Sequence, residues 1–417
     1  GCAGLGSGLV VPPVFANCSG TAPVSGETVT CDDTAPAVVT TGVVAVPNST
    51  AVTVLVTPGA TLAPASGPGV HVRNASSVEN RGTLVLGAGN TLEAIFAQDT
   101  GNTVVNHGTI TTAGTTSDGI QANGNDNRLS NAASGSITTS GGSANGILTA
   151  GGHRNVVENA GRILVQGVGA HGIYVNGGQG NTVTNRGEVR AVGGVGHGIY
   201  VTGTDSRIVN EAGGLISSQI GRGVILSGGG TLINDGIIEA QFLAVLLGPG
   251  GSTLINRGQI RGGTGGVESS GAGADRLEML GGSITGAVSQ GEGDDVVLML
   301  DGTLQQVDQG NGNDRFEIRG GTVTGTVQQG AGIDDFVMSG GQIGALLQGD
   351  SLDTFAMTGG HIVGAFEDGD RAVMTGGRIG RVNMKLDDNV FEMSGGTIDG
   401  NLVTGFGNDT IVLSHGY

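Results

Sequence analysis

Four short runs in the last third of the chain combine glycine with aspartate or asparagine, at 291–295, 310–314, 330–335 and 405–409. Runs of this kind can bind Ca²⁺ when carboxylates and carbonyls from consecutive turns converge on the ion. The alternative is that the acids only form turns, with their side chains bonded to nearby backbone and solvated. Calcium is therefore a possible cofactor, and no other is expected. The aspartates that would act as ligands are Asp294, Asp295, Asp314, Asp334, Asp335 and Asp409.

Two further groupings could carry chemistry. Gly349-Asp350-Ser351-Leu352 reads like the nucleophile block of a GDSL esterase, but no Asp-x-x-His partner arrangement accompanies it. It also occupies the slot of the glycine–aspartate runs in the neighbouring repeats. His171 and His197 lie in identical His-Gly-Ile-Tyr segments, so they could stack, hold a metal or ligand, or sense pH. We expect no catalytic residues and a protein that is not an enzyme.

These segments belong to a repeat that organises most of the chain. Around Asn185, an Asn, an apolar residue, a second Asn, a Gly and another apolar residue follow one another at every second position. That alternation is typical of a β-strand, and its return every 22 to 28 residues predicts stacked units. We expect the recurring asparagines to stack inside, each side-chain amide bonding the next. They are Asn80, Asn106, Asn131, Asn159, Asn185, Asn210, Asn234 and Asn256.

The repeat changes near residue 274, where it shortens to between 17 and 20 residues and carries Gly-Gly pairs such as Gly320-Gly321. We therefore expect three segments: an N-terminal cap over 1–73, long coils over 74–273 and shorter coils over 274–417. Each coil suits roughly three short strands separated by turns, with apolar residues inside and polar residues outside. The predicted fold is an all-β solenoid.

Composition agrees with a narrow core that is repeated along a rod. The 417 residues include 85 glycines, no Trp and only nine Phe, too few bulky side chains to fill one large core. The net charge is −18, and residues 274–417 alone carry 7 basic and 21 acidic groups. Such an acidic surface disfavours nucleic acid and bare anionic membrane as partners.

All three cysteines lie near the start of the sequence. Cys18 and Cys31 enclose a short loop and could form a disulfide that caps the rod, with Cys2 left over or exchanging into the pair. No apolar run approaches the length of a membrane-spanning helix.

The Asn-x-Val-x-Asn-x-Gly-x-Ile coils, followed by Gly-Gly-x-Ile-x-Gly-x-Val with Gly-x-Gly-x-Asp, resemble the passenger domain of a Gram-negative autotransporter (type V secretion). The resemblance covers about residues 74–417 and is strongest to the AIDA-type and pertactin-like adhesins. It implies a right-handed parallel β-helix, exported through the periplasm and displayed at the outer membrane by a C-terminal β-barrel outside this chain. It also allows release of the passenger into the medium.

The function that this resemblance implies is adhesion. Passengers on neighbouring cells would associate with one another, or attach to a host receptor or glycan, through side-by-side polar contacts that support aggregation and biofilm formation. The alternative is a carbohydrate-active β-helix, a polysaccharide lyase or hydrolase, which would need acidic residues gathered with Lys or Arg on one strand face. The candidate binding positions are Thr103, Asn176, Thr182, Thr202, Thr322, Gln328 and Gln342.

Overall fold

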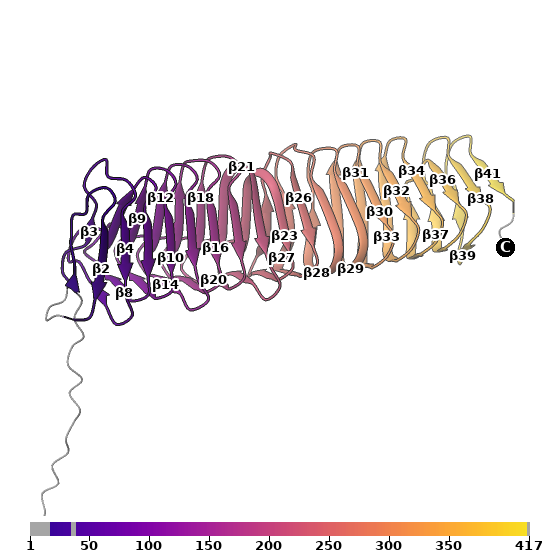
Figure 1. Ribbon diagram of the computed structural model, residues 1–417. Coiled ribbons are helices and arrows are strands. Elements are labelled where there is room, and N and C mark those ends of the chain that lie inside the picture. Colours follow the sequence, from indigo (N-terminus) through magenta and orange to yellow (C-terminus); the bar gives the residue numbers. More distant parts are fainter. Residues whose placement is uncertain (1–16, 35–38, 415–417) are drawn as a thin grey trace, which may run out of the picture.

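The computed structural model describes residues 17–34 and 39–414, which form a long, narrow rod (Figure 1). This part of the chain contains 41 β-strands and no helix, and it winds through about 17 turns. Accordingly, it holds no helix of the length and apolarity that crossing a membrane requires. Apart from one antiparallel pair at the N-terminal end, its paired strands run parallel. The predicted all-β, parallel β-helix is confirmed.

Each turn contributes strands to three parallel stacks. The first stack holds the strands that end at the repeated asparagines, and its strands pair residue for residue, so that Asn159 lies beside Asn185. Its separate members are β2 (Thr28–Asp32), β4 (Thr53–Val56), β7 (Ser77–Asn80), β10 (Thr103–Asn106), β13 (Arg128–Asn131), β16 (Val156–Asn159), β19 (Thr182–Asn185), β26 (Ser252–Asn256), β30 (Arg315–Ile318), β32 (Asp335–Met338), β34 (Thr354–Met357), β36 (Arg371–Met374), β38 (Val390–Met393) and β41 (Thr410–Leu413).

The second stack follows the turn after the asparagines, and the third stack completes the coil. The second holds β5 (Thr61–Leu62), β8 (Thr83–Leu86), β11 (Thr109–Thr112), β14 (Ser136–Thr139), β17 (Arg162–Val165), β20 (Glu188–Ala191), β22 (Leu215–Ser218), β24 (Ile237–Ala240) and β39 (Thr397–Ile398). The third holds β3 (Val43–Val44), β6 (Val70–Arg73), β9 (Ile95–Gln98), β12 (Ile120–Asn123), β15 (Ile147–Ala150), β18 (Ile173–Asn176), β25 (Leu243–Leu247) and β40 (Leu402–Val403).

Longer strands run around a corner and take part in more than one stack. They become common toward the C-terminal half, where the turns between stacks shorten. They are β21 (Ile199–Asn210), β23 (Val224–Asn234), β27 (Gln259–Ser269), β28 (Arg276–Ser289), β29 (Val296–Asn311), β31 (Thr322–Ala331), β33 (Gln342–Asp350), β35 (His361–Glu367) and β37 (Arg378–Asn383).

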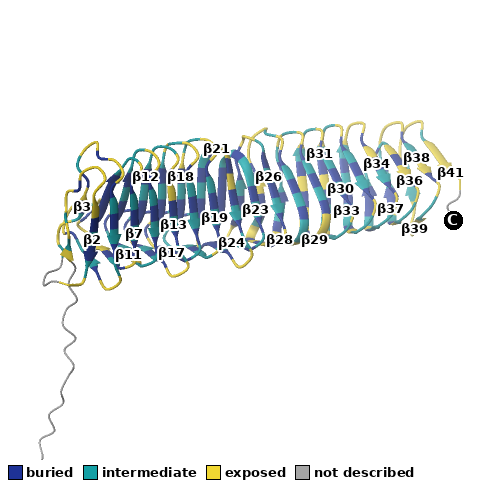
Figure 2. Cartoon of the chain, viewed as in Figure 1, coloured by how far each residue is buried: buried dark blue, intermediate teal, exposed yellow. Residues whose placement is uncertain are grey.

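Strand β19 shows why these sequences form this structure. Thr182 and Thr184 face outward and are half-buried, whereas Val183 and Asn185 point inward and are buried. Because successive side chains of a strand point to opposite faces, every coil adds its alternate apolar residues to one continuous core (Figure 2). The core is thus narrow in cross-section and as long as the rod.

The eight repeated asparagines form a single internal column, which we call the Asn column. Each is buried, and the side-chain Nδ2 of each donates to the Oδ1 of the next at 2.7–2.9 Å. The amide groups satisfy one another along the rod axis, so their burial costs little hydrogen bonding. The column ends at Asn256, whose Nδ2 lies 3.7 Å from the sulfur of Met279.

Part of the predicted cap over 1–73, including Cys2, lies outside the described residues, and the described part differs from the prediction. Strands β2 and β4 already stack in parallel on β7, so regular winding begins near residue 28. The pattern hides this because Cys31 and Val56 occupy the slots that hold asparagine from Asn80 onward. The element that covers the end of the first stack is β1 (Asn17–Cys18), which pairs antiparallel with β2 and is joined to it by the Cys18–Cys31 disulfide.

The coils remain in register across residue 274, since β26 pairs with β28 and β28 with β29. Beyond that point methionine or isoleucine takes over the slot of the Asn column, and in three successive coils a phenylalanine fills the neighbouring inward slot of the first stack. Phe336 stacks between Phe316 and Phe355, with ring centroids 5.6 and 5.7 Å apart. One solenoid therefore contains two kinds of interior.

Candidate binding groove

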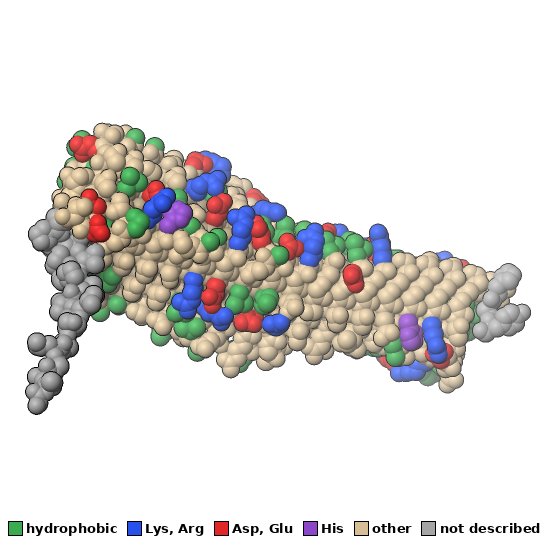
Figure 3. Space-filling model, turned by 60° about the horizontal axis from the view of Figure 1, so that its bottom comes forward, with side chains coloured by type: hydrophobic (Ala, Val, Ile, Leu, Met, Phe, Trp, Pro, Cys, Tyr) green, Lys and Arg blue, Asp and Glu red, His purple; other side chains and the backbone are tan. Residues whose placement is uncertain are grey.

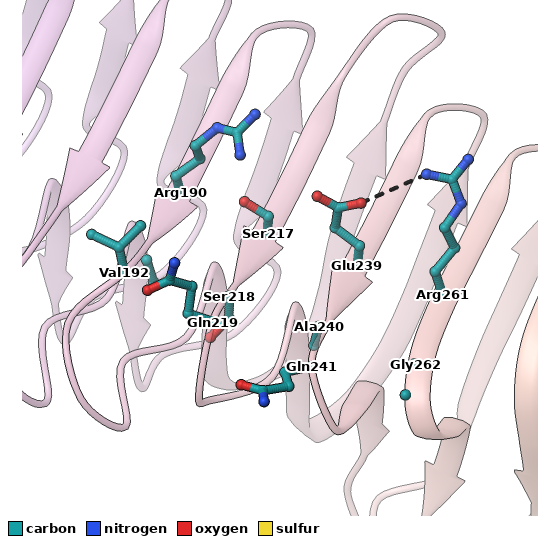
Figure 4. Close-up of a pocket in the computed structure, with 12 residues that line it drawn as sticks. Arg190, Val192, Ser217, Ser218, Gln219, Glu239, Ala240, Gln241, Arg261 and Gly262 are labelled. Carbon is teal, nitrogen blue, oxygen red and sulfur yellow. Dashed lines mark ion pairs between the residues drawn. The ribbon is translucent and has the colours of Figure 1, made fainter.

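A groove of about 530 Å³ lies on the outer side of the second stack, across β20, β22, β24 and the start of β27 (Figure 4). Its wall is formed by four residues in strict register, Arg190, Ser217, Glu239 and Arg261. The next residue of each strand is small, which leaves a hollow where the chain turns. These small residues are Ala191, Ser218, Ala240 and Gly262, and the rim beyond them includes Val192, Gln219, Gln241 and Gly263.

Ion pairs hold the charged side chains of the groove. Arg261 Nη1 lies 3.6 Å from Glu239 Oε2, and Arg190 contacts Glu188 on its own strand. The side chains of Arg190 and Arg261 are 40% and 49% exposed, so these pairs are open to solvent. Exposed pairs of this kind add little to stability, about 0–1 kcal/mol. Their guanidinium groups can therefore turn toward a ligand at small cost.

The groove offers donors and acceptors in a row along the rod. Figure 4 shows Ser217 and Glu239 between the two arginines, with Gln219 and Gln241 along one side. Neighbouring rungs are about 4.8 Å apart, the spacing of parallel strands. Arginine binds carboxylate and sulfate-like groups with two parallel N–H bonds, while glutamine and serine accept or donate single bonds. An extended polar chain such as a glycan suits this arrangement.

The lining holds one carboxylate, Glu239, beside Arg261. Glycoside hydrolysis generally uses two carboxyl groups that face each other across the scissile bond. The groove thus holds one acid–arginine pair of the kind that the carbohydrate-active alternative required.

The sequence contained a signal for the groove that the seven predicted binding positions did not use. Three residues of the groove each follow an Asn-column residue by five positions: Arg190, Glu239 and Arg261. Because equal positions of successive coils stack, these side chains align on one face. Figure 3 shows acidic and basic side chains next to one another along the rod, with mostly uncharged surface between them.

The seven predicted binding residues do not share a surface. Thr103 and Thr182 lie on the first stack, and Thr322 lies beside Gln342 on the second. Thr202 on the third stack accepts a bond from the backbone N–H of Gly177 at 2.8 Å. Asn176 precedes that glycine, and Gln328 lies much farther along the third stack. The seven residues therefore lie on three sides of the rod, and their role in binding stays a prediction.

The predicted calcium ligands also diverge. Asp294 is exposed, whereas Asp295, Asp314 and Asp334 are buried inside the first stack, so the turn-forming alternative was wrong to expect them solvated. Asp335 pairs with Arg315 outside, and Asp409 Oδ1 accepts the N–H of Asn389 at 3.1 Å. In the part of the chain that the structure describes, no three His, Cys, Asp or Glu side chains are grouped to hold a metal ion.

His171 and His197 stack with ring centroids 4.9 Å apart and continue a column that bonds side chain to backbone. Nδ1 of His171 accepts the N–H of His197 at 3.1 Å, and Nδ1 of His197 accepts that of Arg222 at 3.0 Å. Burial lowers the pKa of both imidazoles to about 4. Because Nδ1 is the acceptor, the neutral rings carry their proton on Nε2. The pair acts as two rungs of the scaffold.

These features define a β-helix domain of the pectate-lyase-like class. Residues 25–277, more than half of the chain, match the family described as the BigA third pectate lyase-like domain, and the chain belongs to that family. The match ends at the junction where the Asn column gives way to methionine. No curated protein and no solved structure matches the chain.

Proposed function

We propose that this protein is a surface-displayed adhesin of the passenger type, and that the groove across β20–β27 is its contact with a glycan or with a neighbouring rod. The observation that carries this is the row of Arg190, Ser217, Glu239 and Arg261, aligned by the solenoid on one side. Membership of the BigA domain family and the sequence resemblance to autotransporter adhesins support the same class.

The rod suits adhesion because its rigidity fixes the spacing of the contacts. A partner that engages several rungs at once binds with little further loss of freedom, so weak polar contacts add up to useful affinity. Aggregation, biofilm formation and host attachment are the outcomes that such a contact would serve. We further propose that the passenger is of the AIDA or pertactin-like type.

The test is to display the chain on a cell that does not otherwise clump. Aggregates of these cells are counted, and their binding to a glycan array is measured. The variant Arg190→Ala/Arg261→Ala removes both guanidinium groups from the groove and should reduce adhesion at least several-fold. The matched control is Arg128→Ala/Arg207→Ala, which removes two outward arginines of the first stack and should leave adhesion unchanged. Equal adhesion by all three proteins would overturn the groove as the contact.

A second candidate is a carbohydrate-active enzyme, favoured by the contact between Glu239 and Arg261 within a groove. Release of new chain ends from a panel of acidic and neutral polysaccharides would test it. If the protein cleaves a polysaccharide and a folded Glu239→Gln variant does not, the enzyme proposal would replace the adhesin proposal. Binding without cleavage would keep the adhesin proposal.

A further inference from the structure

A second internal column runs along the first stack, formed by the residue just before each strand. In the long coils it holds asparagines such as Asn127 and Asn155, and after a short stretch of small residues it holds aspartates. We call these aspartates the Asp column: Asp275, Asp295, Asp314, Asp334, Asp353 and Asp370.

Within the Asp column, one carboxyl oxygen of each later member accepts the backbone N–H of the member before it, at 2.7–2.8 Å. The other oxygen, Oδ2, is buried without a partner in four consecutive coils. The four side chains concerned are at most 1% exposed. They are Asp295, Asp314, Asp334 and Asp353.

Asn127, in the same column, has no such orphan atom. Oδ1 of Asn127 accepts the N–H of Asn102 at 2.9 Å, and its Nδ2 donates to two carbonyls at 3.0 Å. Asn389, at the far end of the aspartates, also donates to the carbonyl of Leu386 at 2.9 Å, while its Oδ1 is buried without a partner. The slot therefore suits a group with one acceptor and one donor, which a carboxyl group provides only when it carries a proton.

Among the described residues, no Lys, Arg or His forms an ion pair with a member of the Asp column. Its nearest neighbour inside is a column of four glutamines that bond one another and the backbone: Gln290, Gln309, Gln329 and Gln348. Arg276 and Arg315 follow members of the column but pair with Glu278 and Glu317 on the outside. The other charged groups that act on it are acids: Asp294, Asp308, Asp368 and Asp387.

Carboxylates stacked one coil apart in a dry interior oppose one another's ionisation. Burial raises the pKa of Asp295, Asp314 and Asp353 to about 7, and neighbouring aspartates push in the same direction. Burial also raises the pKa of Asp275, Asp334 and Asp370.

We propose that the Asp column is a proton-binding site inside the rod. The bound protons make the C-terminal half more stable against unfolding in mild acid than in alkaline solution. The folded chain binds these protons more tightly than the unfolded chain does. Stability from this source is therefore full below the ordinary aspartate pKa, and it is lost as pH rises toward about 7.

The test compares thermal unfolding of the full chain at about pH 5 and about pH 8. The wild type should unfold several degrees lower at the higher pH. The variant Asp295→Asn/Asp314→Asn/Asp334→Asn/Asp353→Asn should lose most of that difference, because asparagine bonds in the same slot at either pH. Asp118, whose pKa burial also raises to about 7, stays in the variant and accounts for a residual slope.

The matched control removes four exposed acids of the same region, Glu292→Gln/Asp301→Asn/Asp350→Asn/Glu392→Gln, and changes the net charge equally. It should keep the pH dependence of the wild type. Equal pH dependence in the wild type and in the buried variant would overturn the proposal. A carbon-13 titration of the wild-type carboxyl groups decides the matter if the buried variant does not fold, since midpoints near 4 for the column would also overturn it.

Discussion

The long coils up to about residue 277 and the shorter coils beyond it solve one problem in two ways. Both must bury a polar residue at the corner of every turn. In the slot just before each strand of the first stack, the long coils use asparagines such as Asn127, whose side-chain oxygen and nitrogen are both hydrogen-bonded. The shorter coils use aspartates with one oxygen unpartnered, beside methionine and phenylalanine. A parallel β-helix thus keeps its backbone register while its interior changes from neutral and amide-rich to acidic and aromatic.

The largest loss of stability is expected in the aromatic interior of the shorter coils. Phe336→Ala would leave a cavity between two stacked rings and cost about 3–5 kcal/mol. Because each coil contacts only its neighbours, the loss should be local. Hydrogen exchange should rise in β30–β34 and stay unchanged in β13–β19. The control is Phe406→Ala, where the ring is 80% exposed and its removal should change little. Uniform loosening of the whole rod would contradict local stacking.

A smaller effect is expected in the Asn column. Asn185→Ala removes the acceptor for Asn159 at 2.8 Å and the donor to Asn210 at 2.9 Å, and leaves both partners buried. The cost should be about 2–3 kcal/mol, measured by urea unfolding. Asn176→Ala, at an exposed amide nearby, serves as the control and should stay within about 0.5 kcal/mol of the wild type. If the two variants lose the same stability, the column does not hold the coils together.

The effect that is smallest at neutral pH concerns the stacked histidines, which should respond to pH in the opposite sense to the Asp column. Their pKa of about 4 lies below the ordinary value near 6.5, so the unfolded chain binds protons first. This pair therefore weakens the long coils as pH falls from about 6.5 toward 4. His171→Asn/His197→Asn, which copies Asn145 in the same column, should flatten that slope in thermal unfolding. An unchanged slope would show that the rings do not titrate as buried groups.

Much of the long-coil architecture could be predicted because its signals are local. The spacing of asparagines and the alternation around them locate the strands, and stacking of equal positions then aligns Asn159 with Asn185. The first coils could not be predicted from the asparagine pattern, because Cys31 and Val56 occupy the position that asparagine holds in later coils. The groove was not predicted either, since it depends on four small residues that lie together at one corner of successive coils.

The aspartates show where sequence stops being informative. Asp294 and Asp295 are adjacent and identical, yet one is exposed and the other lies in the core. Which of two neighbours points inward depends on how the chain turns at the corner, and that is set by contacts with the coils before and after. By itself the sequence determined the strand period, the coil length and the membership of the asparagine column. Only the tertiary structure decided which outward side chains share a face and which acids are buried, because both depend on how each coil lies on the next.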